Sequence, residues 1–104
     1  MTLRFRDDPD NDRYVAEDDG DVAASTNYHV VRGGRRLFDH TVTNSGYEGR
    51  GVASQLVQFA LDDMLVKGHR IVPQCPFVAG FVDEHPQYEE LVDRAMLAEL
   101  RDSS

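Results

Sequence analysis

A glycine-rich turn in the middle of the chain connects a β-rich run to an amphipathic helical run. Residues 37–43 have the pattern of a strand, residues 48–53 form the turn, and residues 52–67 carry the helical pattern. Such a turn brings several backbone N–H groups to the positive end of a helix dipole, where a phosphate group can bind. Gly49 and Gly51 have no Cβ, so a pyrophosphate can approach their backbone closely.

Two common phosphate-binding loops do not fit the spacing of this turn. A Walker A loop needs Gly-Lys-Ser/Thr, and no lysine stands here. A dinucleotide fingerprint needs a third glycine where Ser54 stands, and an acidic residue about 20 residues further on after a second strand. Taken alone, the turn is compatible with another kind of phosphate site or with a plain surface turn.

The pattern along the chain predicts one α/β domain over residues 1–104. Strands are expected at residues 3–6, 13–16, 22–32 and 35–43. The acidic sequence around Gly20 and the pair Gly33-Gly34 are typical of hairpin turns, so these four strands are expected to be antiparallel. A short fifth strand at residues 70–72 follows a helical crossover and is therefore expected to run parallel to the fourth.

The helix expected at residues 52–67 has one broad apolar stripe at helical spacing. The stripe consists of Val52, Ala53, Leu56, Val57, Ala60, Leu61 and Met64. Gly68 ends this helix, and Pro76 begins a second one. A last helix is expected over residues 86–100, with Leu91, Val92, Ala95 and Leu100 facing inward.

Composition limits the partners and the compartment. The net charge of −8 disfavours binding to nucleic acid or to anionic membranes, and it is compatible with a basic amine substrate or simply with a solvated acidic surface. No run resembles a signal peptide or a transmembrane span. The single cysteine allows no internal disulfide, which favours a cytoplasmic protein. The four histidines and Cys75 lack metal-ligand spacing, so no metal is expected.

Further segments extend the pattern on both sides of the turn. They are the His40-Thr41-Val42 run, residues 70–78 with their Cys-Pro-Phe sequence, Phe81, the His85-Pro86 pair and Tyr88. Over roughly residues 13–92, their order and spacing resemble a small, single-domain subgroup of the GNAT superfamily of N-acetyltransferases. The acetyl-CoA loop of that superfamily reads Arg or Gln, two residues, Gly, one residue, Gly or Ala. Gly51 and Ala53 match it, whereas Glu48 stands in the Arg/Gln place.

The resemblance implies a minimal GNAT-like fold with a mixed sheet, in which the fourth and fifth strands splay apart and acetyl-CoA enters the gap as a cosubstrate. The residues implied at its pantetheine arm, through their backbone, are Thr41, Val42 and Thr43. The residues implied at its pyrophosphate, through their N–H groups, are Gly49, Arg50, Gly51, Val52 and Ala53. Arg50 either adds charge there or faces solvent, and Ser54 either touches phosphate or starts the helix.

Two residues are candidates for catalysis. Cys75 follows the fifth strand, where the resemblance places the thioester, and it is either an acetyl-accepting nucleophile or a buried inert thiol. His40 is either the general base or a structural histidine, and strand alternation points it opposite to Thr41. Phe81 stands roughly where many GNAT enzymes have a tyrosine that protonates departing CoA. Tyr88 is then either a substitute acid or an ordinary packing residue.

The first functional hypothesis is an acetyl-CoA-dependent N-acetyltransferase acting on a primary amine, which is a protein lysine, a protein N-terminus or a small molecule. The alternatives are a noncatalytic acyl-CoA-binding or sensing module and an interaction domain without ligand. Larger GNAT enzymes insert helices between the first two strands to help bind the acceptor. Only six residues separate Arg6 from Arg13, so the acceptor site is expected to be open and shallow. His85 is expected to cap the N-terminus of a helix or to pack, and the protein is expected to be a monomer or weak dimer.

Overall fold

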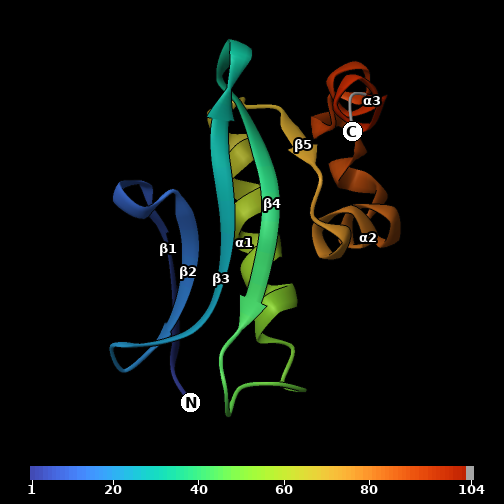
Figure 1. Ribbon diagram of the computed structural model, residues 1–104. Helices are drawn as coiled ribbons and strands as arrows, with labels where there is room; N and C mark the ends of the chain where they lie inside the picture. The colour runs from blue at the N-terminus through green and yellow to red at the C-terminus, as the bar shows by residue number, and fades with distance from the viewer. Residues whose placement is uncertain (103–104) are drawn as a thin grey trace.

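The computed structural model describes residues 1–102 and contains one five-stranded sheet, with strand order β1-β2-β3-β4-β5, and helices around it (Figure 1). The strands are β1 (Leu3–Asp8), β2 (Arg13–Asp18), β3 (Asp21–Val31), β4 (Arg35–Thr43) and β5 (Ile71–Pro73). The α-helices are α1 (Val52–Lys67), α2 (Pro76–Glu84) and α3 (Arg94–Asp102), and the short 3-10 helices are η1 (Pro9–Asn11), η2 (Arg32–Gly34) and η3 (Pro86–Leu91). The first four strands pair antiparallel and β5 pairs parallel to β4, which confirms the expected mixed α/β sheet.

Helix α1 covers one face of the sheet and lies behind it in Figure 1. Its apolar stripe is buried as expected, apart from the half-buried Ala53. Aromatic side chains on the α1 side of the sheet pack together: the ring of Tyr14 lies 5.5 Å from that of Tyr28 and 6.3 Å from that of Phe38. This face is therefore the core, and the backbone of β2, β3 and β4 is fixed against α1.

A polar network ties the C-terminal half of α1 to the sheet. The buried hydroxyl of Tyr14 donates to Asp63, and that of Tyr28 donates to Asp7 at 2.7 Å. Lys67 bridges the two carboxylates, at 2.8 Å from Asp63 and 3.6 Å from Asp7. Burial and then these hydrogen bonds raise the pKa of both tyrosines well above the usual range, so both phenols stay protonated and remain donors.

The expectation of one last helix over residues 86–100 is wrong. The chain instead forms η3, breaks at Val92 and Asp93, and restarts as α3. The helix is interrupted because the chain pairs with the outer edge of β5. Val92 forms a parallel bridge with Ile71, and the Asp93 N–H donates to the Ile71 carbonyl at 2.9 Å. A helical residue at these positions would lose both contacts.

The break also changes which side chains face inward. Ala95 is exposed, contrary to expectation, and the inward positions of α3 belong to Met96 and Leu97. Asp93 starts the new helix, since its Oδ1 accepts a hydrogen bond from the Met96 N–H at 3.0 Å. Its other carboxylate oxygen accepts from the Arg35 guanidinium on β4. The first two strands each run two residues further than expected, to Asp8 and Asp18.

This anchor predicts a pH dependence of stability. The hydrogen bond from the Met96 N–H and the Arg35 guanidinium hold the pKa of Asp93 below its ordinary value in the folded state. A carboxyl whose folded pKa is depressed stabilises the fold above its unfolded pKa, and this contribution is lost as the pH falls through the folded pKa. Asp93→Asn keeps an oxygen for the Met96 N–H but loses the charge. Denaturant titrations between pH 7 and pH 3 should show a shallower loss of stability for this variant than for wild type, and equal slopes would contradict the anchor.

Candidate functional site

The sheet opens where β5 stops pairing with β4. Among residues 1–102, β5 pairs with three residues of β4, from Arg36 to Phe38. The next contact is the Cys75 N–H, which donates to the Phe38 carbonyl at 2.8 Å. Pro76 then begins α2, which leads the chain away from the sheet. Beyond Phe38, β4 therefore has an edge that β5 does not cover.

The backbone of β4 presents hydrogen-bonding groups along this edge. The Asn44 N–H donates to the Ala23 carbonyl at 2.8 Å, so Asn44 faces β3. Backbone groups of successive strand residues alternate in direction, which turns Thr41 and Thr43 toward the open edge and Val42 toward β3. Of the three residues expected at a pantetheine arm, the first and third therefore have free edge positions. From Phe38 to Thr43 the edge is roughly 17 Å long at the usual rise of a strand.

The edge leads to the N-terminus of α1, which no side chain caps. The first intrahelical bond runs from the Gln55 N–H to the Gly51 carbonyl, at 3.1 Å, so the N–H groups of Val52, Ala53 and Ser54 lack helical acceptors. Gly51 has φ of 73°, in the left-handed region, and a Cβ built on it would meet open space. Free N–H groups beside open space at a helix N-terminus form a seat for an anion.

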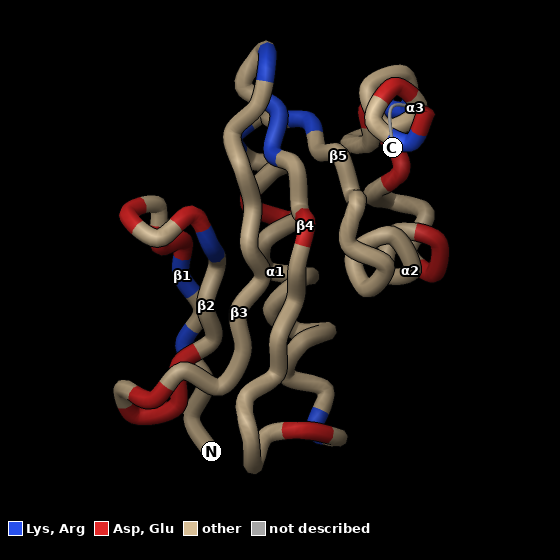
Figure 2. Tube along the Cα trace, in the orientation of Figure 1, with Lys and Arg blue, Asp and Glu red and all other residues tan. Residues whose placement is uncertain are grey.

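Glu48, which stands where the acetyl-CoA loop pattern has Arg or Gln, makes a hydrogen bond within the loop. Its Oε2 accepts a hydrogen bond from the Gly46 N–H at 2.9 Å. The carboxylate therefore stabilises the turn that precedes the helix. Arg50 is exposed two residues later, and Figure 2 shows an acidic stretch followed by a basic one in this loop.

Cys75 lies at the apex of the opening and is buried. Its Sγ is 3.2 Å from the Thr41 Oγ1, and that hydroxyl is 3.0 Å from the Oγ1 of the buried Thr26 on β3. The thiol is thus in a hydrogen-bonded row with two threonine hydroxyls on the α1 side of the sheet. Thr26 belongs to the site although sequence reasoning missed it; its alternation with Tyr28 along β3 was the available signal.

His40 lies on the opposite face of the sheet. In the pairing of β3 with β4, Tyr28 faces Phe38 and Asn27 faces His40, so Asp39 is an extra residue that forms a bulge. The bulge puts Phe38 and Thr41 on the α1 side and the exposed His40 on the open side. The structure therefore does not bring His40 and Cys75 together on one face.

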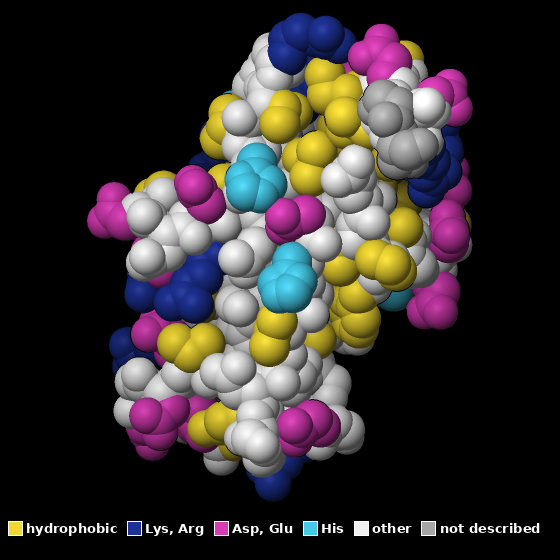
Figure 3. Space-filling model, viewed as in Figure 1, with side chains coloured by type: hydrophobic (Ala, Val, Ile, Leu, Met, Phe, Trp, Pro, Cys, Tyr) yellow, Lys and Arg dark blue, Asp and Glu magenta, His cyan; other side chains and the backbone are white. Residues whose placement is uncertain are grey.

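The open face of the sheet carries ionisable groups beside the apex. The exposed Asp39 carboxylate accepts a hydrogen bond from the His29 ring at 2.9 Å. Figure 3 shows two histidine side chains on this face with an acidic side chain between them. Asp39 gave no signal in the sequence, because its position depends on the bulge.

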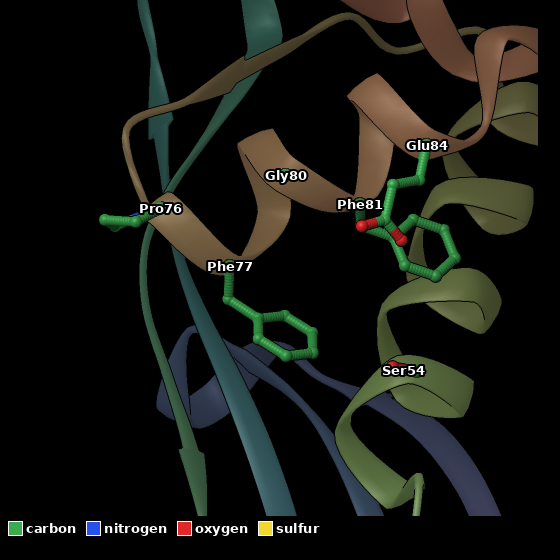
Figure 4. A pocket seen from close by; sticks show the side chains of 6 residues that line it. All are labelled: Ser54, Pro76, Phe77, Gly80, Phe81 and Glu84. Carbon is green, nitrogen blue, oxygen red and sulfur yellow. The ribbon is translucent and has the colours of Figure 1, made fainter.

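Two adjoining hollows lie between α1, α2 and the β4 edge. The first, of about 180 Å³, is lined by Thr43, Tyr47, Gly49, Gly51, Val52, Ala53, Ser54 and Phe77. The second, of about 230 Å³, is lined by Ser54, Pro76, Phe77, Gly80, Phe81 and Glu84 (Figure 4). The exposed ring of Phe77, from α2, borders both hollows, and it is another site residue that the sequence did not reveal. All the residues expected at the pyrophosphate except Arg50 line the first hollow.

Comparison with known proteins identifies the family. Residues 13–91, more than half of the chain, match the model of a family described as GCN5-related N-acetyltransferase. The chain belongs to the GCN5-related N-acetyltransferase family. The resemblance expected from the sequence is thereby confirmed.

One curated relative of this N-acetyltransferase family member is Protein NATD1 of Bos taurus, 38% identical over 61 residues. These residues are 55% of this chain and 54% of that protein, so the chain spans about half the length of the curated relative it matches.

Two solved structures share the fold. The solution structure of a GCN5-like protein from Staphylococcus aureus has a TM-score of 0.66 at 18% identity, covering 86% of this chain and 87% of that one. The crystal structure of a ribosomal-protein-alanine N-acetyltransferase from Brucella melitensis has a TM-score of 0.50 at 19% identity, covering 77% and 60%. At such identities the likeness concerns the fold.

In this N-acetyltransferase family member, the aromatic rings near the end of α2, unlike that of Phe77, serve the packing. Phe81 stacks on His85 with ring centroids 3.9 Å apart, and the His85 Nδ1–H donates to the Phe81 carbonyl at 2.8 Å, so His85 closes the end of α2. The buried Tyr88 donates its hydroxyl to Asp62 of α1 at 2.7 Å. Burial and then this bond raise the pKa of Tyr88 to about 12. Tyr88 is thus a packing residue that links η3 to α1.

The described part of the chain contains neither a metal-binding cluster nor a membrane-spanning helix. Among residues 1–102, no group of three or more His, Cys, Asp or Glu side chains is placed to hold a metal ion. In the same residues, no helix combines the length and apolar character needed to span a membrane.

Proposed function

We propose that the protein is an acetyl-CoA-dependent N-acetyltransferase that acetylates a primary amine on a protein or a small molecule. The observation that carries this proposal is the open edge of β4 that leads directly into the uncapped, glycine-rich N-terminus of α1. Acetyl-CoA has a phosphate-bearing end and a reactive thioester end joined by an amide-containing arm. The site offers an anion seat, a strand edge and an apex in the same order.

Each part of the site would bind one part of the donor. The backbones of Thr41 and Thr43 would pair with the amides of the pantetheine arm, as an added strand pairs with a sheet edge. The N–H groups of Val52 and Ala53, which lack helical acceptors, would bind the pyrophosphate, Gly51 would leave room for it, and Arg50 would add a positive charge. Gly49 lets the phosphates approach, and Ser54 borders the same hollow. The thioester would then lie at the apex beside Cys75.

The two faces of the sheet favour direct transfer over a covalent acyl-enzyme. The donor supplies an activated acetyl group, and the amine would approach from the open face, which carries His40 and Asp39. His40 would accept the proton that the amine loses as the new C–N bond forms, while the thioester C–S bond breaks and CoA leaves as its thiolate. Two threonine hydroxyls lie beside Cys75. Among the hydrogen bonds of the described residues, none joins the Cys75 thiol to a base on the same face of the sheet.

The second candidate function is a noncatalytic acyl-CoA-binding module. It is favoured by the aromatic side chains of the site among the described residues, because Phe81 has no hydroxyl and the hydroxyls of Tyr47 and Tyr88 already donate to Asp18 and Asp62. Turnover on a panel of primary amines separates this function from catalysis, and binding of CoA separates both from an interaction domain without ligand.

The phosphate seat is tested by Gly51→Ala against Gly68→Ala. The two glycines flank α1, both have left-handed φ values (73° and 71°), and a Cβ on either meets open space. Each substitution therefore carries a similar backbone cost of about 1–2 kcal/mol. Gly51→Ala should weaken CoA at least about tenfold, the scale of one lost hydrogen bond to a charged group. Gly68→Ala should bind CoA as wild type does in calorimetric titrations, and equal affinities of the two variants would exclude the seat.

The role of His40 is tested by a pH profile. As the general base, His40 must be neutral to accept a proton, so kcat/KM should rise with pH in the wild type. His40→Gln should slow turnover by about a hundredfold or more and remove this rise. CoA affinity should stay unchanged, because the side chain lies on the open face of the sheet. A rise that survives in His40→Gln would assign the base to another group.

The route of transfer is tested at Cys75. Direct transfer predicts that Cys75→Ala keeps measurable turnover and that wild type incubated with acetyl-CoA alone gains no acetyl group. Rapid-quench mass spectrometry checks both forms of the protein. An acetyl-Cys75 species that forms and decays as fast as turnover would establish the covalent route instead.

A further inference from the structure

The hollow beside the phosphate seat carries a negative charge. This second hollow adjoins the seat through Ser54 and Phe77, and Glu84 lines it from the end of α2. In Figure 4 the Glu84 carboxylate turns from α2 into the space that Ser54 and Phe77 also border. A ligand group that leaves the seat on this side meets an exposed carboxylate before it reaches solvent.

The positively charged side chains of the protein lie or pair away from the second hollow. Of eleven Lys and Arg residues, Arg50 lies on the phosphate loop. Six others pair with carboxylates or with backbone carbonyls away from the seat, and Lys67 pairs at the far end of α1. These six are Arg6, Arg13, Arg32, Arg35, Arg36 and Arg70. Arg4 lies over the β2–β3 hairpin, and Arg94 and Arg101 line a cleft between α2 and α3. The charge nearest to the second hollow is thus that of Glu84.

Coenzyme A carries phosphate in two places, the pyrophosphate and the 3′-phosphate of its ribose. The N-terminus of α1 and Arg50 suit one diphosphate group, which uses the available N–H donors. A 3′-phosphate held close to the seat adds up to two further negative charges near Glu84. Like charges a few ångströms apart repel by about 1 to several RT at a protein surface, and salt screens this repulsion.

We propose that Glu84 sets the donor specificity of this site against the ribose 3′-phosphate, so that thioesters of dephospho-CoA and of 4′-phosphopantetheine serve at least as well as acetyl-CoA. This inference rests on the proposed acyl-donor site and adds its substrate class. The recognised chemistry is a pantetheine arm ending in phosphate, and the adenosine part contributes little.

The test is a comparison of two ligands on three proteins. CoA and dephospho-CoA are titrated into wild type, Glu84→Gln and Asp83→Asn by calorimetry in low salt. Asp83 is the matched control, because it precedes Glu84 on α2 and its loss changes the net charge equally, but it lines the cleft toward α3 instead. Wild type should bind dephospho-CoA as tightly as CoA or more tightly. Glu84→Gln should strengthen CoA about fivefold, leave dephospho-CoA unchanged, and lose this effect at about 1 M salt. Asp83→Asn should behave as wild type with both ligands.

The outcomes separate this inference from the proposed function. If wild type binds neither ligand, the proposed donor site is wrong, and the inference is wrong with it. Tighter binding of CoA than of dephospho-CoA to wild type would overturn the inference and leave the donor site standing. A CoA affinity that is the same in Glu84→Gln and Asp83→Asn would also overturn it. Turnover with acetyl-dephospho-CoA and with acetyl-4′-phosphopantetheine at rates near that with acetyl-CoA would extend the support from binding to catalysis.

Discussion

The open site depends on the point at which β5 stops pairing with β4. Pro73 has no N–H and cannot donate to the ladder, and the Gln74 N–H turns back to the Val72 carbonyl at 3.0 Å. The Cys75 N–H makes the final bond to Phe38, and the following proline starts α2. Every feature further along this edge follows from that stop: the free backbone of β4, the two hollows and the buried thiol at the apex.

The bulge at Asp39 divides the site between the two faces of the sheet. Without an extra residue, strand alternation would place His40 on the same face as Phe38, in the core against α1. The bulge turns His40 outward and turns Thr41 toward α1, where its hydroxyl meets Cys75. One inserted residue thereby separates the histidine from the thiol. It also gives the apex a buried side, which holds the thiol, and an exposed side, which carries the histidine.

The sequence was informative where a local pattern determines the structure. The apolar stripe of α1, the glycine turn before it and the helix start at Pro76 are properties of single segments, and they were predictable. The bulge in β4 and the break at Asp93 were not. The first depends on the register between two strands, and the second on hydrogen bonds from β5, some 20 residues earlier in the chain. For the same reason the sequence could name His40 and Cys75 but could not place them on opposite faces.

The anion seat also explains how a chain with a net charge of −8 suits the proposed phosphate-bearing donor. Net charge acts over a Debye length and governs long extended partners such as nucleic acid, whereas backbone N–H groups act at hydrogen-bond distance. The loop adds one arginine to these N–H groups, and it ties its own carboxylate, Glu48, to the Gly46 N–H. A seat made from backbone recognises a small phosphate group by geometry. In our proposal, the Glu84 carboxylate beside it then limits how much further negative charge the ligand can carry.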